Sequence, residues 1–282
     1  MDRGADAGAG TGGAESDADV GFLRCFGRQM KLLREAAGLT QAQVGERVGY
    51  GEAQIAAVEQ GRRIPKPELI DAVDRAVGAR GVLVAMKEEV AKARYPGFFR
   101  RYAELEAEAV ELHAYINQAI KGLLQTEEYA RAVFRMWRPL LDEEAIEQGV
   151  SARMERQKLF GRRPAPLLSF VIDEHVLRRP LGGREVWRGQ LEQLLLYGYQ
   201  RNVAMQIMPM EREEHAGLAG PFTLIHSKNQ RRMAYMEVQD VSALYAEPKK
   251  VSPLEATYGA LRADALTPRE SLTFIEKLLG EL

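Results

Sequence analysis

The sequence predicts an all-α N-terminal domain of five helices followed by an α+β C-terminal domain. Three observations lead to this division. From Val20 to Ala93, apolar residues recur every three or four positions, which is the spacing of amphipathic helices. Residues 95–97 (Tyr-Pro-Gly) break that spacing, because proline disfavours a helical conformation in the residue before it. Alternation typical of strands occurs only beyond residue 165, among further helices.

The first 19 residues consist mainly of glycine, alanine and aspartate and offer almost nothing to bury. Such a segment cannot offset the entropy lost on ordering, so we expect a disordered acidic tail over residues 1–19. The helical domain is expected over residues 20–94 and the α+β domain over residues 95–282. A chain of 282 residues with 46% hydrophobic content can bury two cores.

Composition limits the classes of function. The chain has 39 lysine and arginine residues against 40 aspartate and glutamate residues, so DNA binding would require a local basic patch. Its single cysteine, Cys25, excludes an intramolecular disulfide framework and is expected to be a partly buried thiol. No apolar run approaches the roughly 20 residues that span a bilayer, and no signal-peptide core is present. We therefore expect a soluble cytoplasmic protein.

The first helix is predicted to begin near Val20. Its apolar face consists of residues three or four positions apart, namely Phe22, Phe26, Met30, Leu33 and Ala37. Arg24, Arg28 and Lys31 lie together on another face. These three cations form either a solvated stripe or a set of phosphate contacts.

A second helix is predicted to begin after Thr40. Thr40, followed three residues later by Gln43, has the form of a capping box. Val44 and Val48 are the inward residues of this helix, and Gly45 leaves room where another helix crosses closely.

Gly49 then permits a left-handed turn into a third helix. Ile55 and Val58 are the inward residues of the third helix, which ends at residues 59–61. Two short helices that cross near a right angle can place the second one in the major groove of DNA.

Two further helices complete the predicted N-terminal domain. Pro67 suits the first turn of a fourth helix, and Gly78 closes it. The inward residues of the fourth helix are Leu69, Ile70, Val73 and Val77. A fifth helix is predicted over residues 82–93.

The segment over residues 39–63 resembles the helix-turn-helix of phage-repressor-like (XRE-type) regulators. The resemblance rests on residues at fixed offsets, namely Leu39, Thr40, Gln41, Val44, Gly45, Gly49, Ile55, Glu59, Gly61, Arg62 and Arg63. It implies a lambda-repressor-like fold and DNA binding. A pair of helices that only pack against each other is the alternative interpretation.

The resemblance also implies roles for individual residues. Gln41 corresponds to a residue that contacts a phosphate at the start of the second helix. Four residues of the third helix occupy positions that face base edges, namely Glu52, Ala53, Gln54 and Ala57. Gln54 can pair with adenine, Glu52 can accept a hydrogen bond from cytosine, and the alanines can contact a thymine methyl group. Because Glu52 is acidic and the alanines are short, we expect modest base specificity or a dependence on dimerisation and DNA shape.

The remaining residues implied by the resemblance lie around the third helix. Arg62, Arg63 and Lys66 follow it directly and are expected to hold the phosphate backbone, with a solvated turn as the alternative. Arg34 and Glu59 match positions that form an ion pair in related repressors, where the pair joins the first helix to the end of the recognition helix.

The C-terminal domain is predicted to begin with three helices. The inward residues of the first are Tyr102, Leu105, Ala109, Leu112 and Ile116. Thr126 and Asp142 have the position of N-caps for the other two.

Strands are predicted next, over residues 167–172, 203–207, 222–226, 233–238 and 243–245, with a helix over residues 184–199. We expect a sheet of about four strands. The domain ends with a helix over residues 254–263 and another opened by a capping box at Thr267 and Glu270.

Several phrases of this region resemble the C-terminal domain of actinobacterial regulators of the WhiJ type. They are GLLQTEEYAR at residues 122–131, ARMERQ at 152–157, DEHVLRRPLGG at 173–183, QIMP at 206–209, GPF at 220–222 and YMEVQDVSALY at 235–245. The function of that domain is unknown. The resemblance implies a developmental or antibiotic-linked regulator that is often encoded beside a small partner protein and has antitoxin-like relatives.

An enzymatic function is not expected. Asp173, Glu174 and His175 are adjacent at a strand end, but Asp173 is better interpreted as the N-cap of a short helix. His113, His215 and His226 are scattered along the sequence without metal-binding spacing. The chain has no glycine-rich phosphate loop and no G-x-S-x-G or H-E-x-x-H motif. We therefore expect no catalytic residues, metal or cofactor.

Two binding functions remain open. One is a transcriptional regulator, expected to be a repressor and a homodimer joined after residue 80, whose C-terminal domain senses a ligand or a small protein. The other is an antitoxin-like adaptor that mainly binds a protein partner and uses DNA binding for autoregulation. The residues that could line a ligand cavity, or simply fill the core, are Tyr197, Tyr199, Met205, Met208 and Met210.

Overall fold

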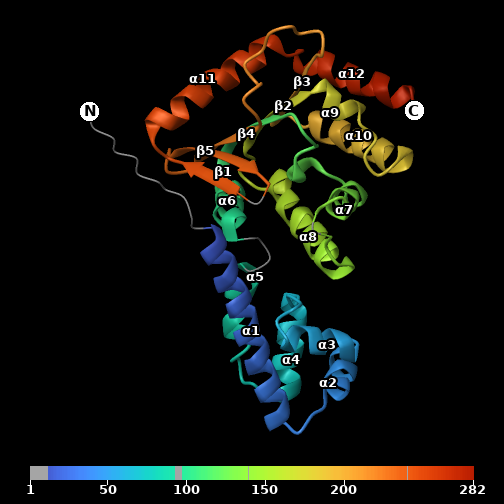
Figure 1. The fold of residues 1–282 in the computed structure, drawn as a ribbon, viewed down its shortest axis with the longest axis vertical. Helices are drawn as coiled ribbons and strands as arrows, with labels where there is room; N and C mark the ends of the chain where they lie inside the picture. The colour runs from blue at the N-terminus through green and yellow to red at the C-terminus, as the bar shows by residue number, and fades with distance from the viewer. Residues whose placement is uncertain (1–11, 93–96, 139, 240) are drawn as a thin grey trace. The chain divides into compact units, whose positions relative to one another are not determined.

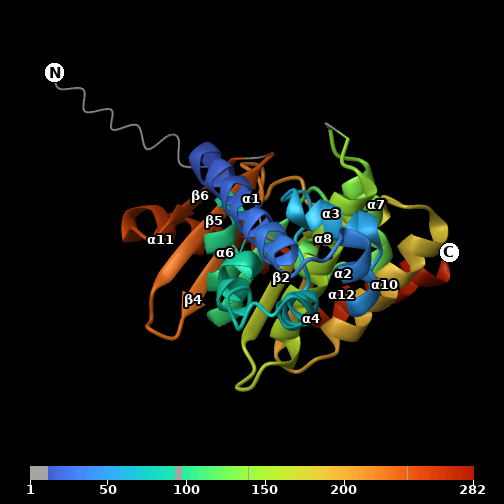
Figure 2. The same ribbon diagram turned by 90° about the horizontal axis from the view of Figure 1, so that it is seen from below.

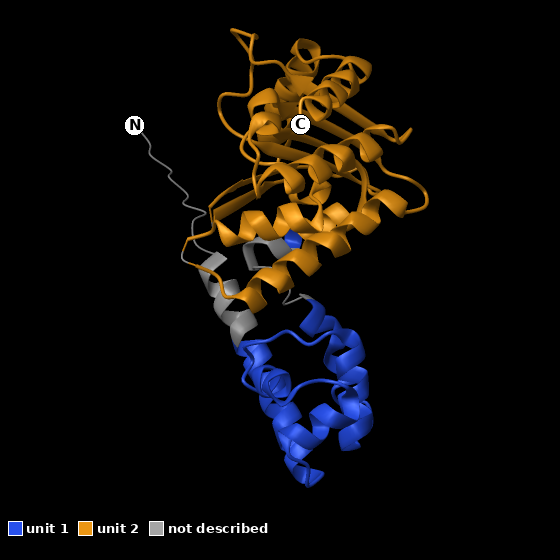
Figure 3. Cartoon of the chain, turned by 90° about the vertical axis from the view of Figure 1, so that its right-hand side faces the viewer, with its two compact units in different colours: residues 1–101 blue, residues 102–282 orange. Residues whose placement is uncertain are grey.

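The computed structural model describes residues 12–92, 97–138, 140–239 and 241–282 (Figure 1). The chain divides into two compact units, residues 1–101 and residues 102–282 (Figure 3). The division therefore falls a few residues beyond the boundary predicted after residue 94. Tyr95 and Pro96, on which that boundary was predicted, lie outside the described residues.

The first unit is helical, as the sequence predicts. Its elements are α1 (Gly12–Ala36), α2 (Gln41–Val48), α3 (Glu52–Glu59), α4 (Pro67–Val77), the 3-10 helix η1 (Val84–Met86) and α5 (Lys87–Lys92). The start of the first helix and the start of the fifth helix differ from the prediction. Residues 12–19, expected in the disordered tail, belong to α1, since this stretch also contains alanine and glutamate, which favour helix. The rest of that predicted tail, residues 1–11, lies outside the described residues.

The fifth helix begins later than predicted because the chain first wraps around a buried carboxylate. Asp74 of α4 is buried and accepts hydrogen bonds from the backbone N–H groups of Gly81, Leu83 and Val84. These bonds hold residues 81–84 in a turn, and a regular α-helix starts only at Lys87. Ala93, the predicted last residue of this helix, is outside the described residues.

The core of the first unit contains most of the apolar residues predicted from helical spacing. It includes Phe26, Met30, Val44, Ile55, Val58, Leu69, Ile70 and Val73. Two residues predicted to be buried or partly buried are exposed. Ala37 is exposed because α1 ends at Ala36, and Cys25 is exposed instead of partly buried.

Glycines allow the close approaches within this unit. Gly49 has a φ of 76° at the end of α2, as the turn requires. At Gly45 a Cβ would overlap the Tyr50 carbonyl oxygen of that turn and would touch the backbone nitrogen of Glu52, where α3 begins. The helix crossing is made at Gly27 of α1, where a Cβ would overlap the carbonyl oxygens of Val58 and Glu59.

The second unit contains a six-stranded mixed sheet, where about four strands were predicted. The strands are β1 (Ala109–Ile116), β2 (Leu167–Asp173), β3 (Val203–Met208), β4 (Phe222–Ser227), β5 (Arg232–Val238) and β6 (Val241–Tyr245). Their order is β3-β2-β1-β4-β5-β6. β1, β2 and β3 are parallel neighbours, whereas β1, β4, β5 and β6 pair antiparallel.

The prediction of one helix through Ile116 is wrong in its second half. α6 (Gly97–Glu108) ends at Glu108, and the residues after it form β1. β1 lies between β2 and β4, so both neighbours satisfy its backbone hydrogen bonds. The spacing of apolar residues over 109–116 also fits a helix, but pairing with β2 and β4 stabilises the strand conformation.

Helices surround the sheet, and β2 and β3 are buried along most of their length, whereas the edge strand β6 has no buried residue. The helices are α6, η2 (Gly122–Leu124), α7 (Glu127–Arg135), α8 (Glu143–Arg156), η3 (Gln157–Gly161), α9 (Glu174–Arg178), α10 (Arg184–Gly198), α11 (Pro248–Asp264) and α12 (Pro268–Gly280). α11 runs beside β4 and β5 (Figures 1 and 2), where Tyr258 and Leu261 pack on Leu224. Three of the N-caps predicted in this unit are confirmed, since the side chains of Thr126, Asp142 and Thr267 accept backbone hydrogen bonds.

Candidate nucleic-acid interface

The N-terminal turn of α3 is the exposed part of the recognition helix. Glu52 and Ala53 are exposed and Gln54 is half-buried, while Ile55 and Val58 are fully buried in the core. One face of α3 is therefore exposed at its first turn, and the opposite face packs in the core.

Ala57 does not belong to the exposed surface, although it was predicted to face base edges. Only 5% of Ala57 is exposed. The chain folds back over it after α3, because the backbone N–H groups of Arg62 and Arg63 both donate to the Ala57 carbonyl, at 2.9 and 3.2 Å. A methyl group covered in this way cannot reach a thymine.

Gln54 has a second task that the sequence analysis missed. Its side-chain Oε1 accepts a hydrogen bond from the backbone N–H of Gly51 at 3.3 Å. Gly51 is the N-cap of α3 and Gln54 is at position N3, so this bond is the N3 half of a capping box, which satisfies the N–H of the N-cap residue. The atom that caps α3 is the same atom that would accept a hydrogen bond from adenine N6.

Arg34 and Glu59 form the predicted pair. Arg34 Nε and Nη2 donate to the two carboxylate oxygens of Glu59 at 2.5 and 3.0 Å, and the side chains are only 8% and 1% exposed. Arg34 Nη1 also donates to the Leu39 carbonyl at 2.8 Å. The hydrogen bond to Glu59 raises the pKa of Arg34. The pair joins α1 to the last residue of α3.

Gln41 takes part in the same network. Its Nε2 donates to Glu59 Oε2 at 2.7 Å, so the side chain ties the first residue of α2 to the end of α3. A phosphate contact through this side chain remains a prediction, and it would compete with the bond to Glu59.

The three cations predicted to hold the DNA backbone lie in the loop between α3 and α4. Arg62 and Lys66 are exposed and Arg63 is half-buried. Arg62 Nε donates to Gln60 Oε1 at 2.7 Å, which holds the guanidinium at the end of α3. Gly61 lets this loop pass against the α1 backbone at Arg24, another exposed cation.

A cavity of about 470 Å³ lies in the second unit, at the carboxyl ends of β1, β2 and β3. Ligands of sheets with parallel strands commonly bind at this edge. Of the five residues that could line a ligand cavity or fill the core, Met208 and Met210 lie on this cavity. Met205 is buried in the core, Tyr197 stacks on Phe160 with ring centroids 3.8 Å apart, and the exposed Tyr199 donates to Glu276.

The cavity wall carries acidic and aromatic groups in fixed positions. Tyr115 donates its hydroxyl to Asp173 at 2.8 Å, and burial raises the pKa of Tyr115. Asp173 has the predicted N-cap position, but its side chain bonds to Tyr115 and caps no helix. Glu174 accepts from Arg178 and from the Met210 backbone N–H, at 2.5 and 3.0 Å. Asn117 Oδ1 is buried there without a hydrogen-bond partner among the described residues.

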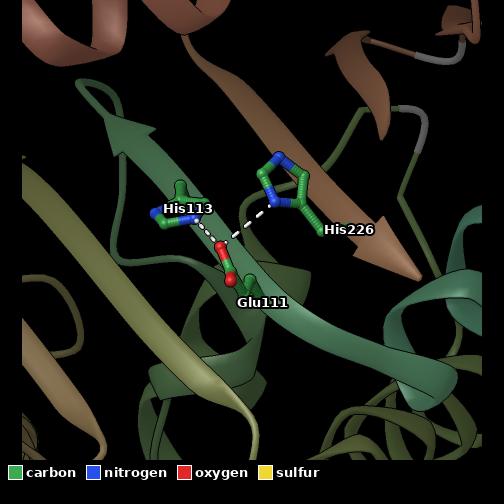
Figure 4. A group of neighbouring side chains, drawn as sticks. All are labelled: Glu111, His113 and His226. Carbon is green, nitrogen blue, oxygen red and sulfur yellow. Dashed lines mark hydrogen bonds and ion pairs between the residues drawn. The ribbon is translucent and has the colours of Figure 1, made fainter. Parts of the chain in front are cut away.

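Two of the histidines regarded as scattered in the sequence are neighbours in the structure. Glu111 Oε2 lies 3.2 Å from His113 Nε2 and 3.1 Å from His226 Nδ1 (Figure 4). Burial lowers the pKa of His113, and the hydrogen bond from His113 lowers the pKa of Glu111. The Glu-x-His spacing is visible in the sequence, but the helix predicted there would not place the two side chains on one face. The contact with His226 is not visible there, because it depends on the pairing of β1 with β4.

Comparisons with known proteins gave two matches. Residues 26–86 match a family model described as a helix-turn-helix domain, and residues 99–277 match one described as a domain of unknown function (DUF5753). No curated protein and no solved structure matches the chain. In the part of the chain that the structure describes, no helix has both the length and the apolar character needed to cross a bilayer.

Proposed function

The chain belongs to the family defined by the domain of unknown function DUF5753, and because a helix-turn-helix domain precedes that domain, we propose that the protein is a sequence-specific transcriptional regulator. We further propose that it is a cytoplasmic repressor of the phage-repressor-like kind, that its second domain is of the WhiJ type, and that it binds DNA as a homodimer. The observation that carries the proposal is the exposed first turn of α3, presented by a unit whose helices are fixed to one another.

Base contacts in this proposal come from Glu52, Ala53 and Gln54. Gln54 is the residue able to make a bidentate contact with adenine, and one such contact provides roughly 1–3 kcal/mol of discrimination. Glu52 would accept from cytosine N4, and Ala53 would contact a thymine methyl group. With Ala57 covered, three residues carry direct readout, which is consistent with modest specificity per monomer.

Phosphate contacts in this proposal come from Arg62, Arg63 and Lys66, together with the N-terminus of α2 at Gln41. Each cation that neutralises a phosphate releases counterions and steepens the dependence of affinity on salt. Because the whole chain has a formal net charge of −1, attraction to DNA would arise in this loop and along α1.

The test begins with selection of binding sites from a random-sequence DNA pool by the purified full chain. Fluorescence anisotropy then compares the selected duplex with a scrambled one over a range of salt concentrations. We expect enrichment of a two-fold related sequence. The double variant Arg62→Ala, Arg63→Ala should bind both duplexes more weakly, and its salt slope should fall by about 0.9 for each phosphate that it no longer neutralises.

A matched control removes two exposed cations from the other unit, as Arg135→Ala with Lys158→Ala. This control should keep the salt slope of the unmodified chain. Failure to enrich any sequence, or equal effects of the two double variants, would contradict the proposal.

For the second domain, we propose that the cavity at the carboxyl ends of β1–β3 binds a small-molecule effector. The wall of Tyr115, Asp173 and Glu174 supports this, because these groups are fixed by hydrogen bonds within an accessible cavity. A ligand with donor groups would suit the acidic wall.

The adaptor function is supported by a different surface. Met136, Trp137 and Leu140 follow α7 and are 49%, 41% and 72% exposed, although apolar residues of this size are usually covered. A small protein partner could cover them. Native mass spectrometry of the chain purified from its host distinguishes the two functions, because a bound metabolite supports the first and a stoichiometric small protein supports the second.

A further inference from the structure

A cluster of potential metal ligands lies on the sheet face that α11 covers, apart from both sites described above. Glu111 and His113 are two positions apart on β1 and therefore point to the same face of the sheet. His226 of β4 is the register partner of Glu111. A shift in register between Ala109 and Glu111 precedes this pair, so β1 has one extra residue there.

We propose that Glu111, His113 and His226 bind a divalent transition-metal ion of the Zn²⁺ class. One donor atom from each residue lies within 4.8 Å of the other two (Figure 4). The carboxylate oxygen is 3.2 Å from one imidazole nitrogen and 3.1 Å from the other. Two ligands held about 2.1 Å from a tetrahedral Zn²⁺ are roughly 3.4 Å apart, so a small adjustment of the side chains would admit the ion.

The chemistry of the donor set selects the class of ion. Imidazole nitrogen suits Zn²⁺, Ni²⁺, Cu²⁺ or Co²⁺, whereas Mg²⁺ and Ca²⁺ prefer oxygen ligands. Two imidazoles and one carboxylate leave a fourth tetrahedral position for water. The side chains of His113 and His226 are only 20% and 21% exposed, so the ion would be partly shielded from solvent.

The carboxylate of Glu255 lies next to His226, one of the proposed ligands. Glu255 of α11 has Oε1 3.4 Å from His226 Nε2, the ring nitrogen that points away from Glu111. In the absence of an ion this nitrogen is buried without a satisfactory hydrogen bond among the described residues. When Nδ1 binds a metal, Nε2 carries the proton and can donate it to Glu255, an arrangement typical of metal-bound histidine.

The ion would act as a clamp between β1 and β4. Its ligands come from both strands, next to the extra residue that interrupts their ladder of hydrogen bonds. Because the folded sheet gathers these ligands and the unfolded chain does not, binding should raise the melting temperature of the second unit.

The experiment uses the tag-free full chain after chelator treatment and dialysis. Zn²⁺ affinity and stoichiometry are measured by competition with a chromophoric chelator, and Co²⁺ serves as a spectroscopic probe. We expect one Zn²⁺ per chain, a higher melting temperature with Zn²⁺, and intense visible Co²⁺ bands of a site with fewer than six ligands. Glu255→Gln should weaken binding roughly 10- to 100-fold, and His113→Gln or His226→Gln should weaken it further.

The chain has four histidines, so the other two provide a matched control. The double variant His175→Gln, His215→Gln should keep the stoichiometry and the Co²⁺ spectrum. Circular dichroism establishes that each variant is folded, and the Co²⁺ spectrum of the unmodified chain decides the question if a ligand variant does not fold. Absence of stoichiometric binding at micromolar Zn²⁺, a six-coordinate Co²⁺ spectrum, or unchanged affinity in folded His113→Gln and His226→Gln would overturn the proposal.

Discussion

Gln54 has a role in the folded structure of α3 and a proposed role in binding DNA bases. Its amide oxygen accepts a hydrogen bond from the Gly51 N–H at the start of α3. In the proposed complex, the amide oxygen and nitrogen together bind adenine. Two substitutions separate the tasks, because glutamate keeps an acceptor for the Gly51 N–H but lacks the donor that adenine N7 requires.

We expect both Gln54→Ala and Gln54→Glu to reduce discrimination at one base pair by roughly 1–3 kcal/mol. Only Gln54→Ala should also loosen the first turn of α3, because it removes the acceptor. Anisotropy with the selected duplex and a single-base variant measures discrimination, and hydrogen exchange reports on α3. If Gln54→Ala weakens the selected and random duplexes equally, Gln54 does not read a base.

The Arg34–Glu59 pair gives a second prediction at this scale. Glu59→Ala leaves the Arg34 guanidinium buried without its carboxylate, and breaking a buried pair on one side typically costs about 3–5 kcal/mol. Hydrogen-exchange mass spectrometry of peptides within residues 23–60 should show the loss as faster exchange. The control Glu35→Ala removes a half-exposed carboxylate from α1, the helix of Arg34, and should change the opening free energy by less than about 0.5 kcal/mol. Unchanged exchange in Glu59→Ala would show that the pair does not hold the unit together.

The sequence predicts residue-scale features well where the partners are local or the family pattern is specific. Thr40 and Gln43 are three residues apart, and Arg34 and Glu59 match known positions. Ala57 was misjudged because its burial depends on the backbone path of residues 60–63. The neighbours of Glu111 were missed for a similar reason, since 115 residues separate it from His226 along the chain.

At the scale of elements, the crossing of α1 over α3 is set by one glycine. A Cβ at Gly27 would overlap two carbonyl oxygens of α3, and backbone atoms cannot move aside as a flexible side chain can. Gly21 lies on the same helix with open space around it. The same substitution at these two positions should therefore have opposite effects.

Gly27→Ala should push α1 away from α3 and destabilise the first unit by about 1–3 kcal/mol. Gly21→Ala should stabilise it by roughly 0.5–1 kcal/mol, because alanine loses less backbone entropy in a helix. Hydrogen exchange within α1 and α3 measures both changes. If Gly27→Ala leaves the stability of the first unit unchanged, the close contact between α1 and α3 does not stabilise the unit.

Elements with a clear local signal were predicted, whereas β1 was not. α2, α4, α7, α8 and α12 each have a cap or proline signal at their start. β1 follows α6 without a turn residue, and its apolar positions fit both helix and strand. Its strand conformation is set by neighbours from residues 167–173 and 222–227, which local sequence does not reveal.

At the scale of the whole molecule, the proposed dimer sets the length of the DNA site. Two recognition helices of a symmetric dimer read half-sites about one helical turn, roughly 34–36 Å, apart. A fragment of residues 21–92 keeps only residues 81–92 of the region after residue 80, in which the dimer contact is proposed. It should therefore bind one half-site without cooperativity.

Footprinting and analytical ultracentrifugation test this prediction together. The full chain should sediment as a dimer and protect two half-sites, and the fragment should sediment as a monomer and protect one at higher concentration. A full chain that protects a single half-site as a monomer would exclude the proposed dimer while leaving DNA binding intact.

The bond between Gln54 and Gly51 also bears on how such a protein would search a genome. On most sequences the amide of Gln54 could stay bonded to its own helix while the protein slides along the phosphates. At an adenine in the right place the amide swings outward and exchanges one hydrogen bond, worth about 1 kcal/mol, for a bidentate contact. If Gln54 reads adenine as proposed, one side-chain rotation would separate a conformation bonded to Gly51 from a conformation bonded to DNA.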